Sequence, residues 1–151
     1  MSISDTWTLT PITRITHTLT LNTSTGVKSF VISGTNNTTG TYTHGTTAYT
    51  DCIASPGYHL TKYRGTDWTG TEEIDFYDCA GLPEELGGDW GMYADRTITA
   101  YAEPNTYTVT YNANGGSGSM SSSTATYNSN FLTNECAFSK TGYRFIGWNE
   151  K

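Results

Sequence analysis

The sequence has few basic residues and no long apolar runs, and each scarcity excludes a class of protein. Lysine and arginine total 8 against 14 acidic residues among 151, giving a formal net charge of -6. No run of lysine or arginine occurs, so the counterion release that drives nucleic-acid binding has no source. No apolar stretch approaches the roughly 20 residues of a membrane-spanning helix. We therefore expect neither a nucleic-acid partner nor membrane insertion.

The N-terminus lacks the pattern of a secretion signal. Residues 1–16 contain neither the basic segment nor the apolar core that such signals have. We expect this segment to form a strand and a linker. Two origins stay open: the chain is a piece of a longer secreted protein, or it is made and assembled in the cytosol, as virion proteins are.

Cysteine is also scarce. The three cysteines, Cys52, Cys79 and Cys136, leave at least one thiol unpaired, and none has CxxC or Cys/His metal spacing. One interpretation is that they are isolated small apolar side chains. The other is a disulfide between Cys52 and Cys79, which would tie a long insertion to a strand.

The sequence lacks the usual patterns of catalytic and metal sites. His17, His44 and His59 lie far apart and form no HExxH pair, so we expect no zinc site. No Gly-x-Ser-x-Gly motif occurs, and residues 115–118 lack the lysine of a phosphate-binding loop, which predicts a flexible turn. A small sheet offers no cleft for the two opposed carboxylates of a glycosidase. We expect no enzyme activity and no cofactor.

Threonine, in contrast, makes up about a fifth of the chain, and β-branched residues favour strands. Threonines alternate with larger residues in several segments, which predicts strands with one face toward a core. Glycine and asparagine turns separate these segments. The sequence therefore predicts a mainly β protein. The predicted strands cover residues 6–12, 17–22, 28–33, 41–43, 46–54, 96–102 and 106–112.

Residues 66–92 are acidic and contain no lysine or arginine. This composition predicts an acidic loop inserted into the first half of the chain, and loops on a rigid scaffold commonly carry recognition. We expect its tip, from Leu82 to Trp90, to contact a partner. Carboxylates there have the oxygen chemistry that calcium prefers, but their spacing does not match an EF-hand loop. The candidate binding residues are Glu72, Glu73, Asp75, Asp78 and Trp90.

Two sequence anchors occur twice, in the same order, which indicates an internal repeat. Residues 17–23 (His-Thr-Leu-Thr-Leu-Asn-Thr) match residues 107–113 (Tyr-Thr-Val-Thr-Tyr-Asn-Ala). Residues 55–60 (Ser-Pro-Gly-Tyr-His-Leu) match residues 140–145 (Lys-Thr-Gly-Tyr-Arg-Phe).

The second copy of these anchors resembles a known family. Residues 107–120, with Asn-Ala-Asn-Gly-Gly after the alternating strand, and residues 140–149, Lys-Thr-Gly-Tyr-Arg-Phe-Ile-Gly-Trp-Asn, resemble the internalin B-repeat, also called the Listeria-Bacteroides repeat. Residues 17–102 resemble a divergent version of it through Ala54-Ser-Pro-Gly-Tyr58 and Arg96-Thr-Ile-Thr-Ala100.

The resemblance implies two tandem β-grasp-like modules. The first covers residues 17–102 and carries the insertion at 66–92, a hinge follows at 103–106, and the second covers residues 107–151. Two departures stand out. Tyr63 occupies the place of the family's tryptophan in the first module, and the second module is incomplete because the family continues beyond its tryptophan.

Glycine and aromatic residues at the anchors have a structural interpretation. Gly57 and Gly142 each precede a tyrosine where the chain turns into a strand, and glycine reaches backbone angles closed to other residues. Tyr58, Tyr143 and Trp148 would fill the small cores. The alternative is an exposed aromatic strip that binds glycans.

The resemblance further implies a role outside the cell. We expect a non-enzymatic stalk or adhesive spacer on a bacterial cell surface, whose partner is a protein or glycan on a host or neighbouring cell, or a copy of itself. The alternative is a virion fibre or decoration protein, or a self-assembling filament subunit. In that case the segment from Asp5 to Ile12 would be lent as a strand to a neighbouring chain.

Overall fold

The computed structural model describes residues 11, 13–76 and 85–149, without the side chains of residues 85–87. These residues form strands and no helix, so the prediction of a mainly β protein is confirmed. In chain order the strands are β1 (Thr16–Thr23), β2 (Val27–Ile32), β3 (Thr39–Thr43), β4 (Thr46–Ala54), β5 (Tyr58–Thr66), β6 (Glu73–Phe76), β7 (Glu85–Met92), β8 (Arg96–Pro104), β9 (Thr106–Val109) and β10 (Ser123–Thr126).

The first eight strands form two sheets that pack face to face, and we call them the sandwich. One sheet has the order β3-β1-β8-β5-β6 and the other the order β2-β4-β7. Alternation explains these strands: in β4, Ala48, Thr50 and Cys52 point inward while the residues between them are more exposed. The predicted segment 6–12 lies outside the described residues except for Pro11, which is in no strand.

Aromatic rings join the two sheets in the core. Phe30 on β2 stacks on Tyr63 of β5 with ring centres 5.1 Å apart, and Tyr63 meets Trp90 of β7 edge to face at 5.6 Å. Phe76 on β6 also packs edge to face on Trp90, at 5.2 Å. Such pairs add to the stabilisation that burial of the rings provides. Leu19, Leu60 and Ile98 are fully buried around them.

The segment 66–92 is not the single acidic loop that its composition predicts. It contains β6 and β7, and β7 pairs along its length with β4, from Thr46 opposite Met92 to Ile53 opposite Glu85. Glycines in β7 hide the alternation, because Gly91 stands between the inward residues Trp90 and Met92. The segment therefore completes both sheets, where a β-grasp-like module with an appended loop was expected.

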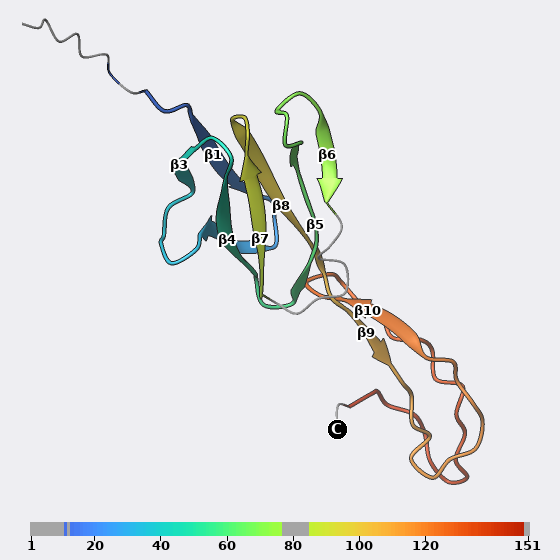
Figure 1. Ribbon diagram of the computed structural model, residues 1–151. Helices are drawn as coiled ribbons and strands as arrows, with labels where there is room; N and C mark the ends of the chain where they lie inside the picture. The colour runs from blue at the N-terminus through green and yellow to red at the C-terminus, as the bar shows by residue number, and fades with distance from the viewer. Residues whose placement is uncertain (1–10, 12, 77–84, 150–151) are drawn as a thin grey trace, which may run out of the picture.

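The chain enters and leaves the sandwich at opposite ends. β1 and β8 are parallel neighbours, with Leu19 opposite Arg96 and Thr23 opposite Ala100. The start of β1 and the end of β8 therefore point in opposite directions along the sandwich, as Figure 1 shows. At about 3.3 Å per residue, the strand path from one end to the other is roughly 35 Å long.

Residues 105–149, which we call the C-terminal unit, continue from the end of β8. β9 and β10 pair antiparallel, with Thr106 opposite Thr126 and Val109 opposite Ser123. Beyond this hairpin a single antiparallel bridge joins Ser117 to Ser139. Much of the unit is exposed, whereas the sandwich holds the buried core. No described segment forms a helix long and apolar enough to cross a bilayer.

Candidate functional site at the junction of the two units

The site begins with the turn between β4 and β5, which we call the first turn (Ser55–Tyr58). The amide of Tyr58 donates to the carbonyl oxygen of Ser55 at 3.0 Å. Gly57 has a φ of 81°, a conformation that costs a residue with a Cβ free energy. A proline at the second position and glycine at the third are typical of a type II turn.

Three residues of the first turn region contact two residues of the C-terminal unit, and we call these five residues the junction. The amide of Asn105 donates to the carbonyl oxygen of Gly57, and the amide of Tyr127 donates to that of Asn105, both at 2.8 Å. His59 Nδ1 lies 2.9 Å from Asn105 Oδ1, within hydrogen-bonding distance. Residues 103–106, for which a hinge was predicted, belong to β8 and β9 except for Asn105.

The ring of Tyr127 covers Gly57. A Cβ added at Gly57 would collide with the ring of Tyr127. The same ring packs edge to face on Tyr58 with centres 5.6 Å apart. Glycine is therefore required at this position twice over, for its backbone angle and for the close approach of the ring.

A second turn with the same hydrogen bond lies in the C-terminal unit, and we call it the trailing turn (Lys140–Tyr143). The amide of Tyr143 donates to the carbonyl oxygen of Lys140 at 3.0 Å, and Gly142 has a φ of 80°. Its surroundings differ, because a Cβ at Gly142 would meet no described atom within 4 Å. Tyr143 is 74% exposed, so it does not fill a core as predicted; the Lys140 ammonium lies 4.7 Å from its ring centre.

The antiparallel strand pairs that precede the two turns, β1 with β3 and β9 with β10, also correspond. Antiparallel pairing sets His17 opposite Tyr42 in the sandwich and Tyr107 opposite Ala125 in the C-terminal unit. One residue beyond the end of the β1–β3 pairing, the amide of His44 donates to the carbonyl oxygen of Ile15 at 2.9 Å. This bond has the same place as the bond from Tyr127 to Asn105.

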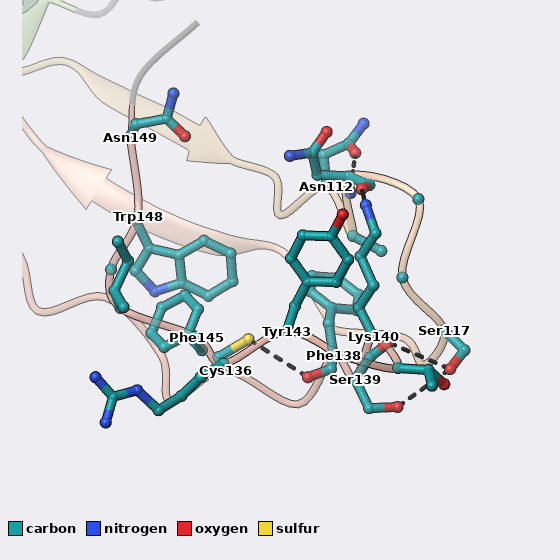
Figure 2. Close-up of a pocket in the computed structure, with 18 residues that line it drawn as sticks. Asn112, Ser117, Cys136, Phe138, Ser139, Lys140, Tyr143, Phe145, Trp148 and Asn149 are labelled. Carbon is teal, nitrogen blue, oxygen red and sulfur yellow. Dashed lines mark hydrogen bonds between the residues drawn. The ribbon is translucent and has the colours of Figure 1, made fainter.

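Trp148 lies in a cluster of rings beside an open hollow of about 1060 Å³ (Figure 2). Its ring centre is 4.8 Å from that of Tyr111, 5.0 Å from that of Phe145 and 6.2 Å from that of Phe138. The indole nitrogen donates to the carbonyl oxygen of Asn134 at 3.2 Å. In the sandwich, Tyr63 follows Gly57 at the spacing at which Trp148 follows Gly142, and it is 4% exposed.

Of the acidic candidates, Glu73 and Asp75 lie together on β6 and pair with basic residues of β5. Asp75 pairs with Lys62 at 2.9 Å, and Glu73 pairs with Arg64 at 3.4 Å, because β6 lies beside β5. Glu72 is exposed, and its amide is within 3.4 Å of Asp67 Oδ1. Asp78 lies outside the described residues. Cross-strand pairing of this kind stabilises a sheet edge.

Trp90 and Cys52 lie in the core. Trp90 is 4% exposed and its indole nitrogen donates to Thr50 Oγ1 at 3.0 Å, so this side chain offers no surface to a partner. Cys52 is buried on β4, and Cys79 lies outside the described residues, so the disulfide stays a prediction. Cys136 is a half-buried free thiol.

Arg96 and Asp67 make hydrogen bonds at the end of the sandwich at which β1 starts. The Arg96 guanidinium donates to the carbonyl oxygens of Thr66 (2.7 Å) and Gly91 (3.3 Å), and burial lowers its pKa. The guanidinium lies over the ring of Trp90, 5.3 Å from its centre. Asp67 accepts hydrogen bonds from Thr69 and from the amide of Thr71, and these lower the pKa of Asp67.

The histidines are distributed over both ends of the sandwich. His17 Nε2 and His44 Nδ1 share a hydrogen bond of 2.9 Å, and Asp95 lies 3.8 Å from His17 Nδ1. Within residues 11, 13–76 and 85–149, no group of three or more His, Cys, Asp or Glu side chains is arranged to hold a metal ion.

Comparison with known proteins bears on the C-terminal unit. Residues 107–151 match the model of the Listeria-Bacteroides repeat domain. No curated protein and no solved structure matches the chain. The repeat-family resemblance of the second segment is thereby confirmed.

Sequence reasoning missed Asn105 and Tyr127 as junction residues. The asparagine stands next to Pro104 at the predicted boundary, and a tyrosine precedes Asn128-Ser129 at a turn. Both were visible as turn signals. Their contact with Gly57 depends on how two distant segments meet, which no local pattern reports.

Proposed function

We propose that this chain is a non-enzymatic structural spacer built from two modules joined rigidly end to end. The observation that carries this proposal is the junction, where the backbone hydrogen bond from Asn105 to Gly57 and the Tyr127 ring hold the C-terminal unit on the first turn. A spacer needs its ends far apart and its joints stiff. The parallel pairing of β1 and β8 separates the ends, and the junction stiffens the joint.

We further propose that residues 17–102 are a divergent copy of the repeat that residues 107–151 match. Three correspondences support this. The strand pairs β1–β3 and β9–β10 end in the same backbone hydrogen bond, the two turns share a hydrogen bond and a glycine with positive φ, and Tyr63 and Trp148 each occupy the centre of a ring cluster. On this comparison, β6, β7 and β8 of the sandwich have no counterpart in the described part of the C-terminal unit.

The place of action that we propose is a bacterial cell surface, where a spacer presents adhesive parts of a longer protein to a protein or glycan partner. The match of residues 107–151 to a repeat-domain family supports this proposal. The alternative role is a virion or filament subunit that lends residues 5–12 to a neighbour, and most of these residues lie outside the described chain.

Backbone ¹⁵N relaxation of the whole chain tests the spacer. If the junction is stiff, amides in the sandwich and in β9 and β10 report one anisotropic tumbling time. Tyr127→Ala removes the ring from Gly57, and the C-terminal unit should then tumble faster than the sandwich. As a control, Tyr107→Ala removes a half-exposed ring of β9 outside the junction and should leave the single tumbling time. Independent tumbling in the unmodified chain would contradict the proposal.

A further inference from the structure

The two turns differ in the residues that cover them. At the first turn, Tyr127 lies on Gly57 and Asn105 donates to its carbonyl oxygen. At the trailing turn, a Cβ added at Gly142 would have no described atom within 4 Å, and Tyr143 is 74% exposed. The same backbone surface is thus closed in one place and open in the other.

A surface that closes the trailing turn in the same way must have two features. It needs an exposed backbone amide at the start of a strand to reach the carbonyl oxygen of Gly142. It also needs a ring on the adjacent strand end to lie on the glycine. In the junction, Asn105 and Tyr127 supply these features, and the bond between them fixes their spacing.

The start of the sandwich has both features. Ile15 precedes β1 as Asn105 precedes β9, and His44 follows β3 as Tyr127 follows β10. The bond from the amide of His44 to the carbonyl oxygen of Ile15, at 2.9 Å, matches the 2.8 Å bond from Tyr127 to Asn105. Ile15 is 66% exposed and His44 is exposed, so the surface is open. We call Ile15, His44 and Asp95 the leading end.

The two surfaces carry opposite charges at Asp95 and at Lys140 and Arg144, and the leading end also has the exposed cation Arg14. Lys140 and Arg144, both exposed, flank Gly142 and Tyr143 in the trailing turn. At the leading end, the side chain of Asp95 is 78% exposed and accepts a hydrogen bond from the amide of Thr18 at 2.7 Å. Opposite charges on two faces steer their association and suppress like-with-like pairing.

We propose that this chain binds a second copy of itself head to tail, with the leading end of one copy covering the trailing turn of the next. The inference deepens the proposed spacer function and rests on its junction, which the contact between copies repeats. Because the contact joins two different surfaces at opposite ends of the molecule, it does not close on itself and extends into a filament. In this contact the His44 ring lies on Gly142 as the Tyr127 ring lies on Gly57. The amide of Ile15 donates to the carbonyl oxygen of Gly142 as the amide of Asn105 donates to that of Gly57.

Sedimentation velocity of the full chain, from micromolar to millimolar concentration, tests this contact. Two variants each block one end: Ile15→Lys sets a cation against Lys140 and Arg144, and Tyr143→Asp removes the ring and sets an anion against Asp95. Both positions are exposed, so we expect both variants to fold. Tyr49→Ser is the matched control, since Tyr49 is 62% exposed in the middle of β4, away from both ends.

The expected result is a weight-average mass that rises about twofold or more for the unmodified chain and the control at high concentration, as for a small interface. Each blocked variant stays monomeric alone. An equimolar mixture of the two forms a heterodimer and no larger species, because only one working end remains on each chain. Circular dichroism spectra that match the unmodified chain establish that the variants fold.

The proposal is overturned if the unmodified chain stays monomeric throughout, if both variants associate like the control, or if the mixture of variants fails to form a dimer. A monomeric chain that still tumbles as one body would leave the spacer standing and remove only the contact between copies. Independent tumbling of the two units would instead remove the spacer.

Discussion

The first turn and the trailing turn have the same hydrogen bond and nearly the same glycine angle, yet they serve the molecule differently. The first turn is sealed by Tyr127 and lies against a sandwich with a full aromatic core. The trailing turn is open, and its Tyr143 is exposed. A repeated backbone motif therefore does not determine whether its aromatic residue is buried. The strands that follow the turn, and the unit that docks on it, determine that.

The largest expected effect separates the two ring clusters. Trp90→Ala removes the ring that contacts Tyr63 and Phe76 and leaves a cavity between the sheets, so the free energy of unfolding should fall by about 3 to 5 kcal/mol. Urea denaturation followed by circular dichroism measures it. Trp148→Ala is the matched change in the C-terminal unit and should leave the main transition nearly unchanged. Equal losses from both variants would contradict the contrast between the clusters.

Substitutions at Arg96 test how much its hydrogen bonds stabilise the end of the sandwich at which β1 starts. Arg96→Met keeps the length of the side chain but leaves the carbonyl oxygens of Thr66 and Gly91 without their donors, at a cost of about 2 kcal/mol in unfolding free energy. Arg96→Lys keeps the charge and loses the planar fork of donors, so it should recover only part of the stability. Full stability of the methionine variant in urea denaturation would show that these bonds contribute little.

Alanine substitutions at Gly57 and at Gly142 compare the first turn and the trailing turn directly. Alanine at Gly57 or at Gly142 adds the strain of a positive φ, roughly 1 to 2 kcal/mol in either turn. Only Gly57→Ala also drives a methyl group into the Tyr127 ring, so it should shift the amide resonances of Asn105 and Tyr127. Gly142→Ala should leave those resonances in place. NMR spectra that change alike in both variants would argue against the closed first turn.

The smallest expected effect concerns the exposed turn after β5. Hydrogen bonds from Thr69 and from the amide of Thr71 lower the pKa of Asp67, so its contribution to stability is present above the pKa of the unfolded chain. That contribution is lost as the pH falls through the lower folded pKa. Carboxyl-carbon NMR titration should find the pKa of Asp67 lower in the folded chain than in a short peptide of residues 66–72. Asp67→Asn should remove the transition, and equal pKa values in chain and peptide would contradict the prediction.

The alternation of threonine with apolar residues predicted the strands in which it is uninterrupted. β1, β4 and β8 follow from threonine alternating with Leu19, Ala48 or Ile98, because one face of each strand is buried and the other is not. β7 was predicted as part of a loop, since glycines and acidic residues surround Trp90. Pairing with β4 selects the strand there, and local propensity does not reveal it.

The positions of the two Gly-Tyr turns were predicted from the sequence, but the burial of the aromatic residues was predicted only in part. The Gly-Tyr spacing located both turns, because glycine at a positive φ is a local requirement. The exposure of Tyr143 and the burial of Trp90 depend on which strands are present around them, so they required the structure. The junction depends on Asn105 and Tyr127 meeting Gly57, a contact between segments far apart in the sequence.

Hydrogen exchange at the amide of Asn105 tests the rigid junction most directly. This amide lies between the two units and donates to the carbonyl oxygen of Gly57 at 2.8 Å. Protection comparable to that of amides in β8, reduced in Tyr127→Ala while β8 keeps its own, is the predicted result. Exchange of Asn105 in the unmodified chain as fast as in an unstructured peptide would contradict the account.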